Sequence, residues 1–139
     1  MQTDTTPTVE DLEFLARPLL GFLTVAAGPV PAQPRPVWFD AAPDGTIQFF
    51  TPSVSPKLRR LRRDPRASLV VAAPAEERER WVSVTGHTTV EPDGAHELAA
   101  RLAARYWDLA DRADDLTALL AEDHVRVVLH PEQVRRAAF

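Results

Sequence analysis

The sequence has no cysteine, a single methionine and only five glycines among its 139 residues. Without cysteine, no disulfide framework, thiolate zinc site or cysteine nucleophile can form. The glycines stand singly, so there is no Gly-x-Gly-x-x-Gly or Walker-type phosphate loop. No apolar run approaches the ~20 residues of a membrane span, and residues 1–7 lack the basic and apolar regions of a signal peptide. We therefore expect a cytoplasmic protein without membrane partners.

Signatures of acid–base and metal catalysis are also missing. The four histidines, His87, His96, His124 and His130, show neither HExxH nor paired metal spacing, so no metal site is predicted. No serine lies in a nucleophile elbow, and no acid pair has the spacing typical of a glycosidase. His87 is expected at a solvent-facing strand position. The sequence therefore indicates no catalytic residue.

Size and charge favour one globular domain with a local basic site. The chain is 45% hydrophobic and 26% charged, which is normal for a soluble globular protein. The net charge is −4, yet residues 55–66 hold six basic residues against one acid. Phosphate affinity grows with clustered positive charge, so this overall acidity is unfavourable for a nucleic-acid binder. A local basic patch suits a small anionic ligand better.

The basic stretch predicts a short helix with well-defined ends. Ser55 is a good N-cap, and Pro56 falls at the first helical position, where its missing N–H costs nothing. Pro65 disfavours helical geometry at Asp64, so the helix should end there. Leucines at positions 58 and 61 can face a core while the arginines point outward.

The same stretch holds Lys57, which is the only lysine among the sixteen Lys and Arg residues. It follows the predicted helix N-terminus, where free N–H groups and the helix dipole favour an anion. Two interpretations stay open: an anion site that needs a compact ammonium, and a plain solvated basic helix.

Periodicity and turn signals predict a mainly β protein, in which residues 9–139 form one domain after a flexible tail over residues 1–8. The six predicted strands are connected mostly as an antiparallel barrel with helical decoration. Pro36 indicates an edge position for its strand, and Pro131 is expected to end the last one. The predicted strands are 21–27, 35–40, 46–51, 67–73, 81–91 and 124–130, and the predicted helices are 9–17, 56–64, 94–107 and 114–121.

The predicted strands on either side of the basic helix in the sequence carry several aromatic residues. Trp38, Phe39, Phe49, Phe50 and Trp81 could cover a flat ring while the basic helix holds a phosphate. Core packing is the alternative for each of these side chains, and Trp81, at a strand start among charged residues, is the least typical of a core.

At these residues the sequence resembles the pyridoxamine 5'-phosphate oxidase-like split barrels, the flavin/deazaflavin oxidoreductase superfamily. It is most similar to the actinobacterial branch that uses the deazaflavin coenzyme F-420. The resemblance covers roughly residues 15–134. It is carried by residues 36–39, 44–51, 57–71, 81–86 and 125–131, above all by the Lys-x-Arg-x-Leu-x-x-Asp-Pro-Arg run that starts at Lys57.

The resemblance implies a six-stranded antiparallel split β-barrel of the FMN-binding type. It also implies a homodimer with the cofactor in a groove between protomers. The family often has Asn at the position of Arg60 and Arg at that of Ser55. By position, the phosphate candidates are Thr51, Ser55 and Lys57, assisted by Arg59 or Arg60; Val37 and Trp38 would lie along the ring, and Arg35, Phe50 and Trp81 near the cofactor.

The leading functional hypothesis is a reductase that transfers a hydride from reduced coenzyme F-420 to a small unsaturated molecule. The cofactor would carry the chemistry, which agrees with the missing acid–base signatures. The alternatives are an FMN-binding oxidoreductase on the same barrel and a non-catalytic flavin or deazaflavin carrier or sensor. A nucleic-acid binder is disfavoured by the overall acidity.

Overall fold

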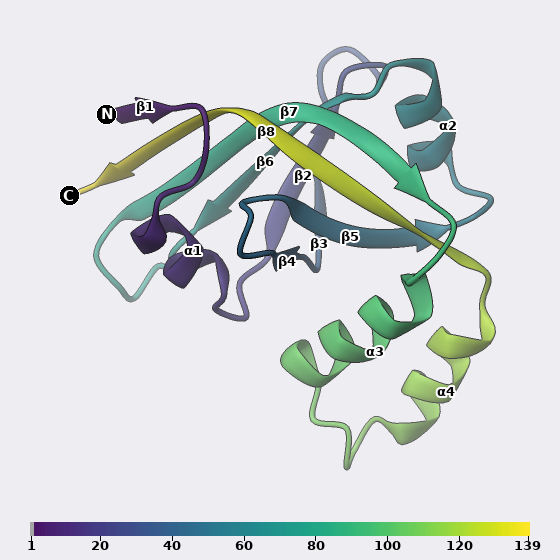
Figure 1. The fold of residues 1–139 in the computed structure, drawn as a ribbon. Coiled ribbons are helices and arrows are strands. Elements are labelled where there is room, and N and C mark those ends of the chain that lie inside the picture. Colours follow the sequence, from purple (N-terminus) through teal and green to yellow (C-terminus); the bar gives the residue numbers. More distant parts are fainter. Residues whose placement is uncertain (1) are drawn as a thin grey trace.

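The computed structural model describes residues 2–139 and shows a strongly curled antiparallel sheet with four helices around it (Figure 1). The sheet order is β3-β2-β6-β7-β8-β5-β4, and β1 pairs with β8 off this path. This arrangement confirms the predicted mainly β split barrel. The strands are β1 (Gln2–Asp4), β2 (Gly21–Val25), β3 (Arg35–Val37), β4 (Asp40–Ala41), β5 (Ile47–Pro52), β6 (Arg66–Ala72), β7 (Arg80–Glu91) and β8 (His124–Ala138). The helices are α1 (Val9–Leu15), α2 (Pro56–Arg63), α3 (Ala95–Tyr106) and α4 (Ala113–Ala121).

The core lies inside the curled sheet and follows from the alternation of the strands. In β5, β6 and β7 every second side chain is buried along much of the strand, as expected for strands with one face on a core. α1 closes one end of the barrel with Phe14 and Leu15, which are at most 1% exposed. The edge position predicted from Pro36 is confirmed, because β3 is the first strand of the sheet.

Two differences in strand number have local causes. The strand predicted over residues 35–40 is divided into β3 and β4, because the chain leaves the sheet at Trp38 and Phe39. In place of a loose tail, residues 2–4 form β1, and Asp4 pairs with Val134 in the register. An ion pair of 2.7 Å between Asp4 and Arg136 holds this strand on β8.

The last strand does not end at Pro131, as the sequence predicts, but continues to residue 138. A bulge allows this: Gly86 of β7 faces Pro131 and Thr85 faces Gln133, so one residue of β8 is left over. A Cβ atom on Gly86 would lie 1.9 Å from the carbonyl oxygen of His130, so the two strands approach each other more closely here than a side chain permits. The bulge accommodates a proline that has no N–H to donate.

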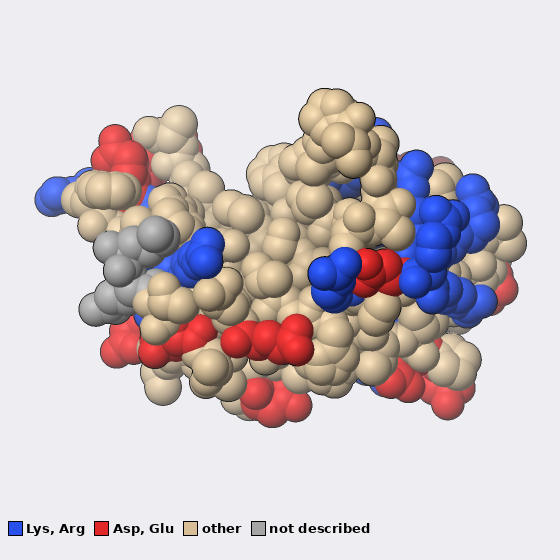
Figure 2. Space-filling model, turned by 90° about the horizontal axis from the view of Figure 1, so that it is seen from above, with Lys and Arg blue, Asp and Glu red and all other residues tan. Residues whose placement is uncertain are grey.

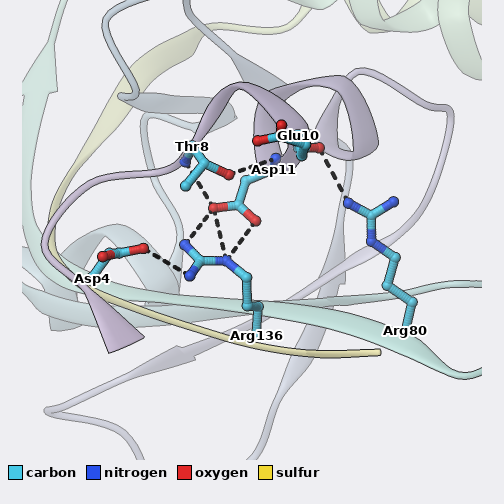
Figure 3. A network of polar contacts seen from close by, with 6 residues as sticks. All are labelled: Asp4, Thr8, Glu10, Asp11, Arg80 and Arg136. Carbon is cyan, nitrogen blue, oxygen red and sulfur yellow. Dashed lines mark hydrogen bonds and ion pairs between the residues drawn. The ribbon is translucent and has the colours of Figure 1, made fainter. Parts of the chain in front are cut away.

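A buried ion pair joins α1 to the end of β8 (Figure 3). Thr8 and Asp11 form a capping box at the start of α1, and the Asp11 carboxylate also accepts two-pronged hydrogen bonds from Arg136. Burial alone raises the pKa of Asp11, but the hydrogen bonds from Arg136 and Thr8 outweigh it, so the pKa lies below its ordinary value. Arg136 binds Asp4 as well, so three segments of the chain meet at one guanidinium.

The remaining helices lie at the other end of the barrel (Figure 1). α2 has the predicted ends: Ser55 accepts a hydrogen bond of 3.1 Å from the Leu58 N–H, and Leu58 and Leu61 are buried. α3 buries an apolar side that includes Leu98 and Leu102. α4 lies beside α3 and has no buried residue. None of the helices within residues 2–139 is long and apolar enough to cross a lipid bilayer.

Candidate ligand pocket beside helix α2

A pocket of about 420 Å³ opens between the end of β3, strand β5 and the three helices α2, α3 and α4. Its walls are apolar and aromatic apart from one charged side chain, that of Lys57. This composition is typical of sites that hold a flat organic ring. The lining residues are Leu20, Pro36, Val37, Trp38, Phe50, Lys57, Trp107 and Leu119.

Packing among aromatic rings fixes the orientation of Trp38 in this pocket. Its ring stacks on Tyr106 with centroids 5.2 Å apart and planes only 2° from parallel. It also meets Trp107 and Phe50 edge to face, at 4.8 Å and 6.3 Å. The Tyr106 hydroxyl donates a hydrogen bond to the carbonyl of Leu19, which holds the stacked ring in place. The ring of Trp38 is therefore a preorganised wall of the pocket.

A second, more enclosed recess adjoins the pocket, and Lys57 lines both. The recess lies against β2, the 28–34 loop and α2, and it holds Arg35, Arg60 and Gln33 in addition to Lys57. The shared lysine therefore stands between an apolar space and a basic one. A ligand with a flat ring and an anionic arm has complementary surfaces on both sides of it.

Lys57 lacks a counter-charge in the part of the chain that the structure describes. Its ammonium makes no ion pair or side-chain hydrogen bond with residues 2–139, and it lies 5.8 Å from the ring centroid of Phe49. Burial lowers the pKa of Lys57, and the positive charge of Arg35 lowers it further. An anion bound between these two side chains would remove this electrostatic cost.

Other cations around the recess are also without ion pairs. Arg35 and four arginines of α2 have no carboxylate partner within residues 2–139, whereas Arg17, Arg66 and Arg105 elsewhere are each ion-paired. Figure 2 shows basic side chains gathered at the end of the molecule where α2 lies. The four arginines of α2 are Arg59, Arg60, Arg62 and Arg63.

Two of the predicted phosphate ligands, Thr51 and Ser55, lie close together but mostly satisfy one another. Their hydroxyl oxygens are 3.1 Å apart, and both residues are buried. Ser55 Oγ also accepts the N–H of Leu58. One hydroxyl hydrogen is used within the pair, which leaves a single hydrogen that can be donated to a ligand. Ser55 caps α2 and so places Lys57, and Thr51 contacts the capping hydroxyl.

The structure brings together most of the other residues named from the sequence. Val37, Trp38, Phe50 and Lys57 line the pocket, and Arg35, Lys57 and Arg60 line the basic recess. Arg59 is exposed and lines neither space.

Trp81 lies in a different part of the molecule. It pairs with Ala72 on one side and with Ala137 on the other, and it lines a hollow beside Arg136 and Phe139. In the same hollow Arg80 donates a hydrogen bond to the Glu10 carbonyl (Figure 3). Within one protomer, Trp81 is not part of the pocket.

Four residues that line the pocket were not predicted as site residues from the sequence. Pro36 lies in β3 beside the predicted Val37, and Leu20, Trp107 and Leu119 come from a loop, the end of α3 and α4. Trp107 directly follows α3. The only sign in the sequence that it could belong to a site was an aromatic residue at the end of a predicted helix. Only the packing of α3 against β5 brings it beside Trp38.

Residues that could hold a metal ion do not gather in the described chain. Within residues 2–139, no three His, Asp or Glu side chains lie close enough to form such a site. His87 and His130 stack at 4.9 Å on the sheet, and the Glu132 carboxylate lies 3.6 Å from Nδ1 of His87, but these side chains do not form a group that could hold a metal ion.

The curled antiparallel sheet is a split β-barrel, the fold of a class of flavin-related oxidoreductases. Residues 8–137 match the Pyridoxamine 5'-phosphate oxidase family, and the chain belongs to that family. No curated protein matches the sequence.

Solved structures share the fold at low sequence identity. A conserved hypothetical protein from Mycobacterium tuberculosis is 24% identical, with a TM-score of 0.71 over 96% of this chain and 85% of that one. An F-420 reductase is 23% identical, with a TM-score of 0.68 over 88% and 94% of the two chains. A FAD-binding protein from Mesorhizobium loti is 22% identical, with a TM-score of 0.67 over 100% and 99%. At these identities the comparisons establish the fold.

Proposed function

We propose that the protein is an oxidoreductase that uses a deazaflavin, coenzyme F-420, to transfer a hydride to a small unsaturated organic molecule. The observation that carries the proposal is the position of Lys57, whose unpaired ammonium lies between an aromatic pocket and a basic recess. Membership of an oxidase family and a structural likeness to an F-420 reductase support it.

The residues present fit such a cofactor. A fused ring needs an apolar slot with a flat wall, which Trp38 and Phe50 provide. A phosphate needs cations that lack other partners, which Lys57, Arg35 and Arg60 provide. The bound cofactor would supply the hydride chemistry, and the chain would bind it, orient it and exclude water.

Each part of the site has a distinct task in this proposal. Lys57 and Arg35 hold the phosphate through charge-assisted hydrogen bonds. Trp38 and Val37 support one side of the ring, and the wall made by Leu119 faces the space left for a substrate. No side chain in the pocket other than Lys57 carries a titratable group, so we expect a substrate that is reduced without an acid from the pocket wall.

FMN is the alternative cofactor, because it also has a flat ring and a phosphate that the pocket and the basic recess could hold. The structural likeness to a FAD-binding protein supports a flavin in the same way. A non-catalytic flavin or deazaflavin carrier would use the same surfaces, and it is distinguished by tight binding without turnover.

We also propose that two protomers share the site. An apolar patch on the outer side of β2, β3 and β6 is continuous with the pocket, since Leu20 and Pro36 belong to both. Leu20, Phe22 and Val70 are 46%, 42% and 39% exposed, and Phe22 pairs directly with Pro36 and Val70. Exposed apolar patches of this kind usually mark interfaces. A second copy would cover the patch and close the pocket into a groove.

The test is a titration of the purified protein with both cofactors. Quenching of the fluorescence of added F-420, followed by turnover with enones or quinones, is the expected result. A yellow protein with bound FMN supports the alternative, and tight binding without turnover over a broad substrate panel supports a carrier. Sedimentation at micromolar concentration should give twice the chain mass. Binding of neither cofactor would overturn the proposal.

A further inference from the structure

The first residue of β8, His124, has a buried ring that holds the end of a neighbouring helix. Its side chain is 2% exposed, and its Nε2 atom lies 3.0 Å from the carbonyl oxygen of Leu119 in α4. A carbonyl only accepts hydrogen bonds, so the ring must donate, and the proton is on Nε2. Nδ1 then carries a lone pair, and it is the only buried side-chain nitrogen or oxygen within residues 2–139 that has no partner.

The same ring contacts two walls of the ligand pocket. The ring of His124 and that of Phe50 meet edge to face, with centroids 5.1 Å apart and an angle of 77° between the ring planes. Both Phe50 and Leu119 line the pocket, the first from the barrel and the second from α4. One buried side chain therefore connects a rigid wall with a wall on a separate helix.

α4 has few anchors on the rest of the protein: it buries no residue, and no basic residue lies in its last turn. Two histidines bind its C-terminal end. His124 binds the carbonyl of Leu119, which also accepts the backbone N–H of Glu122 at 3.3 Å, and His96 of α3 lies 2.9 Å from the carbonyl of Glu122. Of the two bonds, that of His124 is the shielded one, since the His96 contact is exposed.

We propose that His124 is a positioning residue for the ligand pocket: it fixes α4, and with it Leu119, against the barrel so that the pocket stays closed over a bound ring. The inference rests on the proposed function only in taking this pocket as the cofactor site. A side chain that donates a hydrogen bond from the position of Nε2 should therefore preserve the pocket.

Replacing His124 by glutamine or by asparagine tests whether its hydrogen bond to Leu119 holds α4. In His124→Gln the amide nitrogen reaches about as far as Nε2, so the bond to Leu119 is kept. In His124→Asn the amide reaches only as far as Nδ1, so the bond is lost. His124→Leu fills the space without a donor and takes the place of Asn if that variant does not fold. His87→Gln, on an exposed strand position remote from α4, is the matched control.

The first readout is amide hydrogen exchange of residues 113–121 in the protein without cofactor. Loss of one buried hydrogen bond should speed exchange there roughly three- to tenfold in the Asn or Leu variant. The Gln variant and the His87→Gln control should match the wild type within about twofold. The second readout is the dissociation rate of FMN or F-420, whichever binds, which should rise in the same variants by a similar factor.

Equal exchange in the Gln, Asn and Leu variants would overturn the inference, because the bond to Leu119 would then not hold α4. Faster exchange with an unchanged dissociation rate would also overturn it, because α4 would then not close the pocket. If neither cofactor binds, the proposed function fails, while the exchange measurement still decides whether His124 fixes α4.

Discussion

Replacing Lys57 by methionine separates ligand binding from folding. Methionine keeps the length of the apolar stem and removes only the ammonium. If that ammonium donates a charge-assisted hydrogen bond to a phosphate, the contact contributes about 1.5–3 kcal/mol. Binding of F-420 or FMN should then weaken roughly ten- to a hundredfold. The measurement is a fluorescence titration at low and at physiological salt.

The same variant should be as stable as the wild type or more stable, although it binds the ligand more weakly. Burial and Arg35 lower the pKa of Lys57, so the folded protein binds this proton less readily than the unfolded chain. A charged Lys57 therefore costs stability at neutral pH, and the cost fades only as the pH rises above its folded pKa. We expect the unfolding temperature of Lys57→Met to equal or exceed that of the wild type.

Arg62→Met is the control, because Arg62 is exposed and lines neither the pocket nor the recess. It should weaken binding slightly, and mainly at low salt, where distant charges are poorly screened. Equal losses for Lys57→Met and Arg62→Met, or an unchanged affinity for Lys57→Met, would refute a specific anion site. The basic helix would then be only a solvated face.

Three further outcomes are expected. Trp38→Leu should weaken cofactor binding roughly five- to tenfold through lost ring stacking, whereas Trp81→Leu, outside the pocket, should not; equal titration curves would contradict this. Gly86→Ala should destabilise the fold by about 1–3 kcal/mol or more in urea unfolding, because its Cβ has no room. Asp11→Asn should cost roughly 3 kcal/mol at pH 7 by leaving Arg136 underpaired. The lowered pKa of Asp11 stabilises the wild type above its ordinary value of 3.8 and less as the pH falls below it, so the variant should lack this part of the acid dependence.

The parts of the fold that follow local rules could be predicted from the sequence. The ends of α2 depend on Ser55, Pro56 and Pro65, which act within one turn of the helix, and the structure confirms them. The capping box of Thr8 and Asp11 is local in the same way. Alternation in β5 and β6 needs only a period of two, so these strands were predicted within one residue at each end.

The parts that depend on distant partners could not be predicted. β1 exists because Arg136, more than 130 residues away, binds Asp4. The continuation of β8 through Pro131 requires Gly86 on another strand. The same holds for the pocket: the ring contact of Trp38 with Trp107 depends on how α3 packs, and that packing has no signature in the sequence around either residue.

The pairing of β1 with β8 places residue 2 opposite residue 136, so the two ends of the described chain are neighbours (Figure 1). Neighbouring ends make a chain suitable for circular permutation. A short linker could join them, and new ends could be opened in the 28–34 loop, which borders the basic recess and forms no strand or helix. Such a permutant would keep every strand pairing of the barrel while freeing one side of the recess. It would allow the anionic arm of a ligand to be lengthened or tethered without changing a residue of the pocket.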